Sequence, residues 1–232
     1  MLCCNAPPPA RVHRLSLPRK TYQAFLFDMD GTLLTSIAAA ERVWTRWAQR
    51  HGLDAARFVP TIHGARAIDT IRRLQLPGVD PAEEADWVTR EELIDLEGVR
   101  PIAGAPAFLR ALPASRWAIV TSAPAELARR RLQAAGLDVP ETLISADDVE
   151  HGKPDPSGYR LAASRLGVDL AQCLIFEDAA AGIGAAEAAG SRLVVISATH
   201  AQPMQTPHTL IPDYRALTVH VHADGLGVDG LP

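Results

Sequence analysis

The sequence AFLFDMDGT at residues 24–32 joins a short apolar run to an acidic turn. A continuous apolar run of this length is typical of a β-strand that is buried on both faces. Four later runs have the same form, at 117–120, 142–144, 173–176 and 192–196, and segments with helical periodicity separate most of them. This alternation of strand and helix predicts a parallel sheet with helices on both faces, in a three-layer α/β core.

The segment 36–100 interrupts the alternation between the first two strands. Its apolar residues recur at helical spacing, as around Trp44 and Ile71, and no clear strand pattern falls among them. We therefore expect a helical cap domain at 36–100. It would be inserted into a Rossmann-like catalytic core formed by 21–35 and 101–232.

Composition and charge exclude several classes of protein. The formal net charge of -4 gives no electrostatic reason to bind nucleic acid or an anionic membrane, and no apolar run is long enough to span a bilayer. Three cysteines without framework spacing fit a reducing compartment, so we expect a cytoplasmic protein. We expect a monomer, with a dimer as the alternative. Residues 1–20 are interpreted as a flexible leader, and 218–221 as a last strand.

Polar residues follow the ends of three of these apolar runs. They are Asp28 and Asp30, Thr121 and Ser122, and Glu177 and Asp178. Because ligands of an open parallel sheet bind outside the carboxyl ends of its strands, these groups should share one crevice. Carboxylates brought together repel one another unless a cation lies between them, and oxygen ligands alone favour Mg²⁺.

A magnesium site with free positions commonly holds a phosphate. Lys153 can supply a compact positive charge beside it. Thr121, Ser122 and Gly31 can offer hydroxyl and backbone N–H donors to the phosphate oxygens. For Thr121 and Ser122 the competing interpretation is capping of the following helix.

Four segments resemble, in order, the four motifs of the haloacid dehalogenase-like superfamily in its phosphatase form. They are FDMDGTLLTS at 27–36, VTS at 120–122, GKPDPSGY at 152–159 and FEDAAAGI at 176–183. The resemblance extends over about residues 22–200, and the four motifs together make it specific. Within the superfamily the chain looks closest to the group of small sugar-phosphate phosphatases and β-phosphoglucomutases.

The resemblance implies a chemical role for each acidic residue. Asp28 would be the nucleophile that forms an aspartyl-phosphate, and Asp30 would be the general acid and base. Mg²⁺ would be bound by the side chains of Asp28 and Asp178 and by the backbone carbonyl of Asp30. Glu177 would be a further ligand or would support the ligands.

The resemblance also implies how a substrate is held. Thr121 and Lys153 would bind the phosphate, and residues 62–66 of the cap would face the substrate, with His63 and Arg66 as candidate contacts. For His63 and Arg66 the alternative is an ordinary place on the cap surface. The predicted substrate is a small phosphorylated metabolite, a sugar phosphate or a polyol phosphate.

Two other functions stay open at this stage. A phosphomutase of the β-phosphoglucomutase type would return the phosphoryl group to the sugar, but that group has a histidine shortly after the first motif, and residues 36–40 contain none. The second alternative is a catalytically idle protein that uses the fold for binding. The four histidines at 200, 208, 220 and 222 are too dispersed to propose a metal site, and we expect them at the surface.

Overall fold

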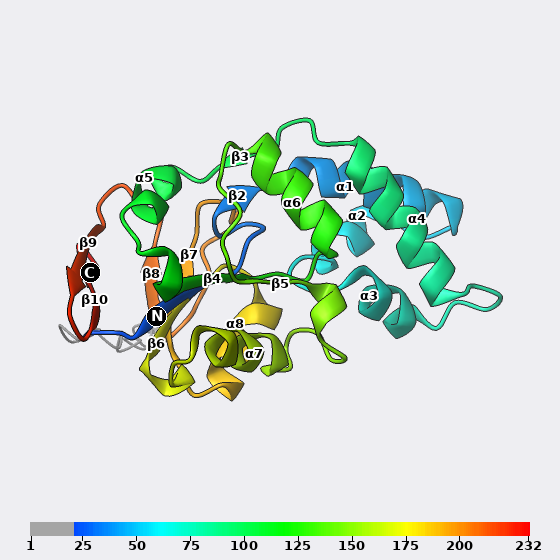
Figure 1. Ribbon diagram of the computed structural model, residues 1–232. Helices are drawn as coiled ribbons and strands as arrows, with labels where there is room; N and C mark the ends of the chain where they lie inside the picture. Colours follow the sequence, from blue (N-terminus) through cyan, green and yellow to red (C-terminus); the bar gives the residue numbers. More distant parts are fainter. Residues whose placement is uncertain (1–20) are drawn as a thin grey trace, which may run out of the picture.

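The computed structural model describes residues 21–232, so the proposed leader at 1–20 lies outside the described residues (Figure 1). Six strands form the main sheet: β1 (Ala24–Phe27), β4 (Trp117–Val120), β5 (Leu143–Ile144), β6 (Cys173–Glu177), β7 (Arg192–Ile196) and β8 (Thr209–Ile211). Their order across the sheet is β5-β4-β1-β6-β7-β8, and every neighbouring pair is parallel. The predicted parallel α/β core is confirmed.

Helices cover both faces of this sheet. One face carries α5 (Ala105–Arg110) and α6 (Ala125–Ala134), and the other carries α7 (Ser157–Leu166) and α8 (Ala180–Ala188) (Figure 1). Successive side chains of β1 point to opposite faces of the sheet, so this one strand contributes to both helix–sheet interfaces. Phe25 and Phe27 belong to the buried cluster that contains Leu127 of α6. Leu26, between them, belongs to the cluster that contains Tyr159 of α7. The strand is therefore buried on both sides, as its sequence predicts.

A separate group of helices lies between the short strands β2 (Leu34–Thr35) and β3 (Arg100–Pro101). The group consists of α1 (Ile37–Arg50), α2 (Ala55–Phe58), α3 (Ala67–Leu74) and α4 (Pro81–Ile94). It has its own apolar core, in which Trp44 and Trp47 pack with Phe58. Because β2 and β3 pair antiparallel, the chain enters and leaves this helical group at adjacent points.

The C-terminal segment departs from the simplest expectation. The predicted last strand exists as β9 (Thr218–His222), but it pairs antiparallel with β10 (Gly225–Asp229) and does not join the main sheet. Tyr22 fixes this hairpin, because its backbone exchanges two hydrogen bonds with Leu226, of 2.8 and 2.7 Å.

Short 3-10 turns lie at Val59–Thr61, Ala114–Arg116, Ala146–Asp148 and Leu170–Gln172. Among the described residues, no helix combines the length and apolar character needed to cross a membrane.

Candidate active site

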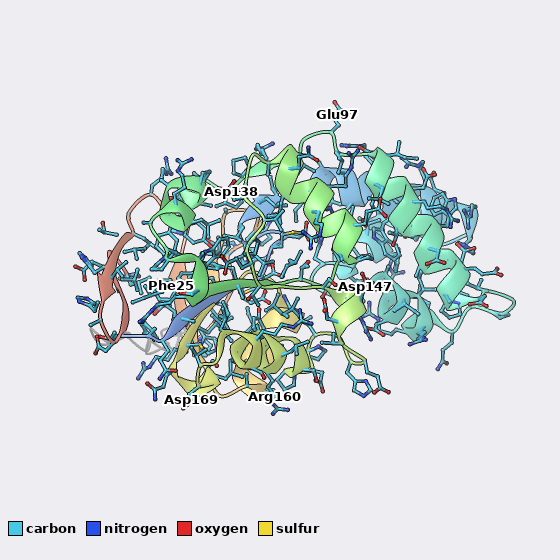
Figure 2. The ribbon with its side chains drawn as sticks, viewed as in Figure 1. Phe25, Glu97, Asp138, Asp147, Arg160 and Asp169 are labelled. Carbon is cyan, nitrogen blue, oxygen red and sulfur yellow. The ribbon has the colours of Figure 1, made fainter. Side chains whose placement is uncertain are left out.

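Three buried carboxylates meet at the carboxyl ends of two neighbouring strands. Asp28 follows β1, Glu177 ends β6, and Asp178 comes next in the chain. One oxygen from each lies within 4.8 Å of the others, and no member is more than 5% exposed. Charged side chains such as Glu97 and Arg160 instead project from the surface (Figure 2). Buried acids at this density require compensating positive charge.

Lys153 supplies part of that charge. Its Nζ lies 2.5 Å from Asp28 Oδ1 and 2.6 Å from Glu177 Oε1, and the residue is only 7% exposed. Burial alone would lower the pKa of Lys153, but the two carboxylates raise it above its usual value. The lysine therefore stays charged, and the cluster holds one ammonium among three carboxyl groups.

The excess negative charge of the cluster fits a divalent cation. Burial and the charge of Glu177 raise the pKa of Asp28 to about 7, although Lys153 opposes the shift. Burial and the charges of Asp28 and Glu177 raise the pKa of Asp178 well above its usual range. The second carboxylate oxygen of Asp28, Oδ2, is buried without a hydrogen-bond partner. A hard cation would bind such an oxygen and favour the ionised acids, and an all-oxygen donor set suits Mg²⁺.

Glu177 supports its neighbours with both oxygens. Oε1 accepts a hydrogen bond from the hydroxyl of Tyr159 at 2.6 Å and contacts Lys153, while Oε2 accepts one from the backbone N–H of Asp178 at 3.1 Å. The carboxylate sits against Gly182, where an added Cβ would lie 1.8 Å from Oε1. These contacts favour a role in placing Lys153 and Asp178, and direct metal ligation by Glu177 stays a prediction.

A tight turn after β1 carries Asp30 out of the carboxylate cluster. Gly31 adopts φ +90°, and a Cβ there would lie 1.9 Å from Asp178 Oδ2, so only glycine fits without strain. Its N–H donates to the Leu34 carbonyl at 2.7 Å, so in this conformation it is not the free phosphate donor that we expected. Asp30 is 27% exposed at its side chain and accepts a hydrogen bond from Ser36 Oγ at 2.5 Å.

A buried arginine also contacts Asp30. Arg131 of α6 is 5% exposed, and its guanidinium lies 3.1 Å from Asp30 Oδ1 and 3.3 Å from Oε1 of Glu92 on α4. Burial would lower the pKa of Arg131, but these two carboxylates raise it. Burial raises the pKa of Glu92 in turn, against the effect of Arg131. The motifs in the sequence give no indication of either residue.

A cleft of about 620 Å³ separates the sheet from the helical group. Its core side includes Asp28, Asp30, Thr121, Ser122 and Arg131, and its helical side includes Ala40, Trp44, His63 and Glu92. The predicted nucleophile and the predicted acid and base therefore open into one cleft.

The predicted phosphate and substrate contacts differ in their surroundings. Thr121 Oγ1 accepts a hydrogen bond from the Ala123 N–H at 3.1 Å, which leaves the hydroxyl proton for a further acceptor. Ser122 Oγ donates to the Gly64 carbonyl at 2.9 Å and so links the core to the helical group. His63 Nε2 lies 3.5 Å from a carboxylate oxygen of Glu41, at the wall of the cleft.

Arg66 is turned toward a core loop. Its Nε lies 2.5 Å from Asp69 Oδ2, and its NH1 donates to the Val149 carbonyl at 3.1 Å. It does not line the cleft that contains Asp28, and instead borders a neighbouring hollow beside Lys153. In this conformation Arg66 holds the helical group against the core, and its contact with substrate stays a prediction.

Known proteins match this chain over most of its length. The family model described as haloacid dehalogenase-like hydrolase matches residues 22–190. The chain is 40% identical to "Hexitol phosphatase A" of Escherichia coli over 80% of this chain and 86% of that protein. It is 34% identical to "2-deoxyglucose-6-phosphate phosphatase 1" of Saccharomyces cerevisiae, over 75% and 80% of the two chains. A crystal structure of a hydrolase from Pseudomonas syringae shares the fold, with a TM-score of 0.69, 24% identity and coverage of 79% and 87%.

Proposed function

The chain belongs to the haloacid dehalogenase-like hydrolase family, and on that premise we propose that it is a Mg²⁺-dependent phosphatase of sugar or polyol phosphates. The observation that carries this proposal is the buried cluster of Asp28, Glu177 and Asp178 with Lys153 among them. Such a cluster suits a cation and a phosphoryl group, which neutralise each other's charge. The names of the relatives support the substrate class, since two of them are phosphatases of hexitol or deoxyglucose phosphates.

The reaction begins at Asp28. One of its carboxylate oxygens attacks phosphorus in line, an aspartyl-phosphate forms, and the bond to the alcohol oxygen breaks. Asp30 gives its proton to the leaving oxygen, then takes a proton from the water that hydrolyses the aspartyl-phosphate. Bound Mg²⁺, held by Asp28 and Asp178, would neutralise phosphate charge, and Lys153 and the Thr121 hydroxyl would bind the remaining phosphate oxygens.

The helical group at 36–100 acts as a cap on the core formed by 21–35 and 101–232. Two contacts support this assignment, one between Ser122 and the Gly64 carbonyl and one between Arg66 and the Val149 carbonyl. A cap that closes on the cleft excludes water from the phosphoryl group and supplies the contacts that select the substrate. His63 and Arg66 are the substrate contacts proposed from the sequence.

Hydrolysis is favoured over phosphoryl transfer back to the sugar. The stretch that carries a histidine in the β-phosphoglucomutase group reads SIAAA here, and Ala40 from it lines the cleft. An alanine cannot exchange a proton with a bound sugar hydroxyl. Product analysis distinguishes the two reactions, because a mutase would yield an isomerised sugar phosphate without free phosphate.

We also propose a cellular compartment and an oligomeric state. We expect a cytoplasmic enzyme that acts as a monomer, with a dimer as the alternative. The one cysteine of the described residues, Cys173, is a buried free thiol, which fits a reducing compartment. Sedimentation at several protein concentrations would determine the oligomeric state.

The direct test is phosphate release from a panel of sugar and polyol phosphates, with and without Mg²⁺. Release should require the ion, and Asp28→Asn should reduce it by about a thousandfold or more, because an amide cannot form the acyl phosphate. Asp138→Asn, at an exposed acid remote from the cluster in the sequence, is the matched control and should retain full activity. Full activity in Asp28→Asn would rule out the proposed mechanism.

A further inference from the structure

We propose that Arg131 is a positioning residue for Asp30, and that Glu92 joins it to the cap, so that the acid and base group is oriented when the cap lies on the core. The inference rests on the proposed function and extends it to a residue outside the motifs. The Arg131 guanidinium bridges two carboxylates, at 3.1 Å from Asp30 and 3.3 Å from Glu92.

The bridge is buried, so it is not an incidental contact between surface charges. The side chain of Arg131 is 7% exposed and that of Glu92 is 10% exposed. A long charged side chain is rarely buried to this degree unless it is paired. The three members come from separate parts of the chain: Asp30 from the turn after β1, Arg131 from α6 and Glu92 from α4 of the helical group. Cap and core therefore meet through this charge pair at the wall of the cleft.

The geometry at Asp30 indicates what the bridge does. Ser36 Oγ and Arg131 NH1 both contact the same carboxylate oxygen, Oδ1. With Oδ1 fixed by two donors, Oδ2 is the oxygen available to exchange a proton with the leaving group or with water. Orientation of a proton donor contributes to rate only when the leaving group needs the proton, and that condition separates positioning from a general structural role.

The experiment compares the first turnover of two substrates, with Mg²⁺ and substrate both at saturating concentration. A hexitol phosphate releases an alkoxide that needs a proton, whereas p-nitrophenyl phosphate releases a stable phenolate that does not. Arg131→Met should slow the first turnover of the hexitol phosphate by about thirtyfold or more and change the nitrophenolate burst by less than about threefold. Arg131→Lys should recover part of the loss. Arg130→Met, at the exposed neighbouring position on α6, is the matched control and should behave as wild type on both substrates.

Glu92→Gln tests the link to the cap and keeps the side-chain volume. It should slow the hexitol phosphate about three- to tenfold and leave the nitrophenolate burst unchanged, and it decides the question if Arg131→Met does not fold. Equal losses on both substrates would overturn the proposal, and so would a raised KM at an unchanged first-turnover rate, which would make Arg131 a substrate contact. A wild-type enzyme inactive on both substrates would instead overturn the proposed function itself.

Discussion

Gly31 lies where a side chain has no room. An added Cβ would sit 1.9 Å from Asp178 Oδ2, and φ is +90°. We expect Gly31→Ala to reduce kcat by about a hundredfold or more, because it displaces a proposed metal ligand, and to lower the free energy of unfolding by about 1–3 kcal/mol. Gly52→Ala is the matched control, with φ +68° and open space around the Cβ. It should lose about 1–2 kcal/mol of stability and keep its activity, as urea titrations and turnover assays would show. Normal turnover in Gly31→Ala would contradict the assigned geometry.

The acidic residues could be predicted to lie together because each follows the end of a predicted strand. Asp28 and Asp178 each come directly after a buried strand, and parallel neighbours bring strand ends together. Arg131 and Tyr159 could not be assigned roles, because each occupies the buried face of a helix and only its three-dimensional partner reveals its use. The sequence did contain one sign of Arg131, because this residue interrupts an otherwise apolar helix face.

His200, expected at the surface, is half-buried and contacts the Asp178 carbonyl at 2.8 Å.

At the scale of elements, the loop after α2 must approach the start of α8 closely. A Cβ on Gly64 would lie 2.7 Å from that of Ala179, and the Gly64 carbonyl accepts the hydrogen bond from Ser122. We expect Gly64→Ala to hold the cap away from the core and to lower kcat/KM on a hexitol phosphate by about tenfold or more. Gly78→Ala, also in the helical group with positive φ but with open space, is the control and should keep kcat/KM within about twofold. Equal kcat/KM in the two variants would exclude closure at this contact.

Apolar composition, more than length, decided whether the sequence revealed a strand, since β5 has only two residues and its apolar run was still predicted. The strands β1, β4, β6 and β7 are runs of four or five mostly buried apolar residues, so their composition identifies them. The pair β2 and β3 has two residues in each strand, and β8 has three, which is too short for a period to show. The C-terminal hairpin depends on pairing with Tyr22, at the far end of the chain, and local sequence carries no trace of that contact.

At the scale of the whole molecule, we expect the buried acids to couple stability to pH and to Mg²⁺. The folded state raises the pKa of Asp28 to about 7, above the value of about 3.9 for an unfolded aspartate. This contribution to stability is therefore full below about pH 4 and is lost as the pH rises through about 7. We expect the increase in Tm caused by Mg²⁺ to be larger at about pH 8 than at about pH 5.5, because the ion compensates the ionised acids.

Thermal unfolding in chelator provides the control for that pH effect. Asn at position 28 cannot ionise, so Asp28→Asn should lose less Tm than the wild type between about pH 5.5 and 8. Parallel curves for the two proteins would show that Asp28 does not titrate in this range. A Mg²⁺ effect independent of pH would contradict a site built from buried carboxylates whose pKa values are raised.

The proposed mechanism depends on covalent attack by Asp28, and rapid quenching in acid would observe the intermediate directly. During turnover of a hexitol phosphate with Mg²⁺, peptide mass analysis should find one alkali-labile phosphoryl group on Asp28, formed at least as fast as free phosphate appears. The same group should be absent in Asp28→Asn and without substrate. Steady turnover with no phosphoryl group on Asp28 at any quench time, or with the group on another residue, would contradict the mechanism.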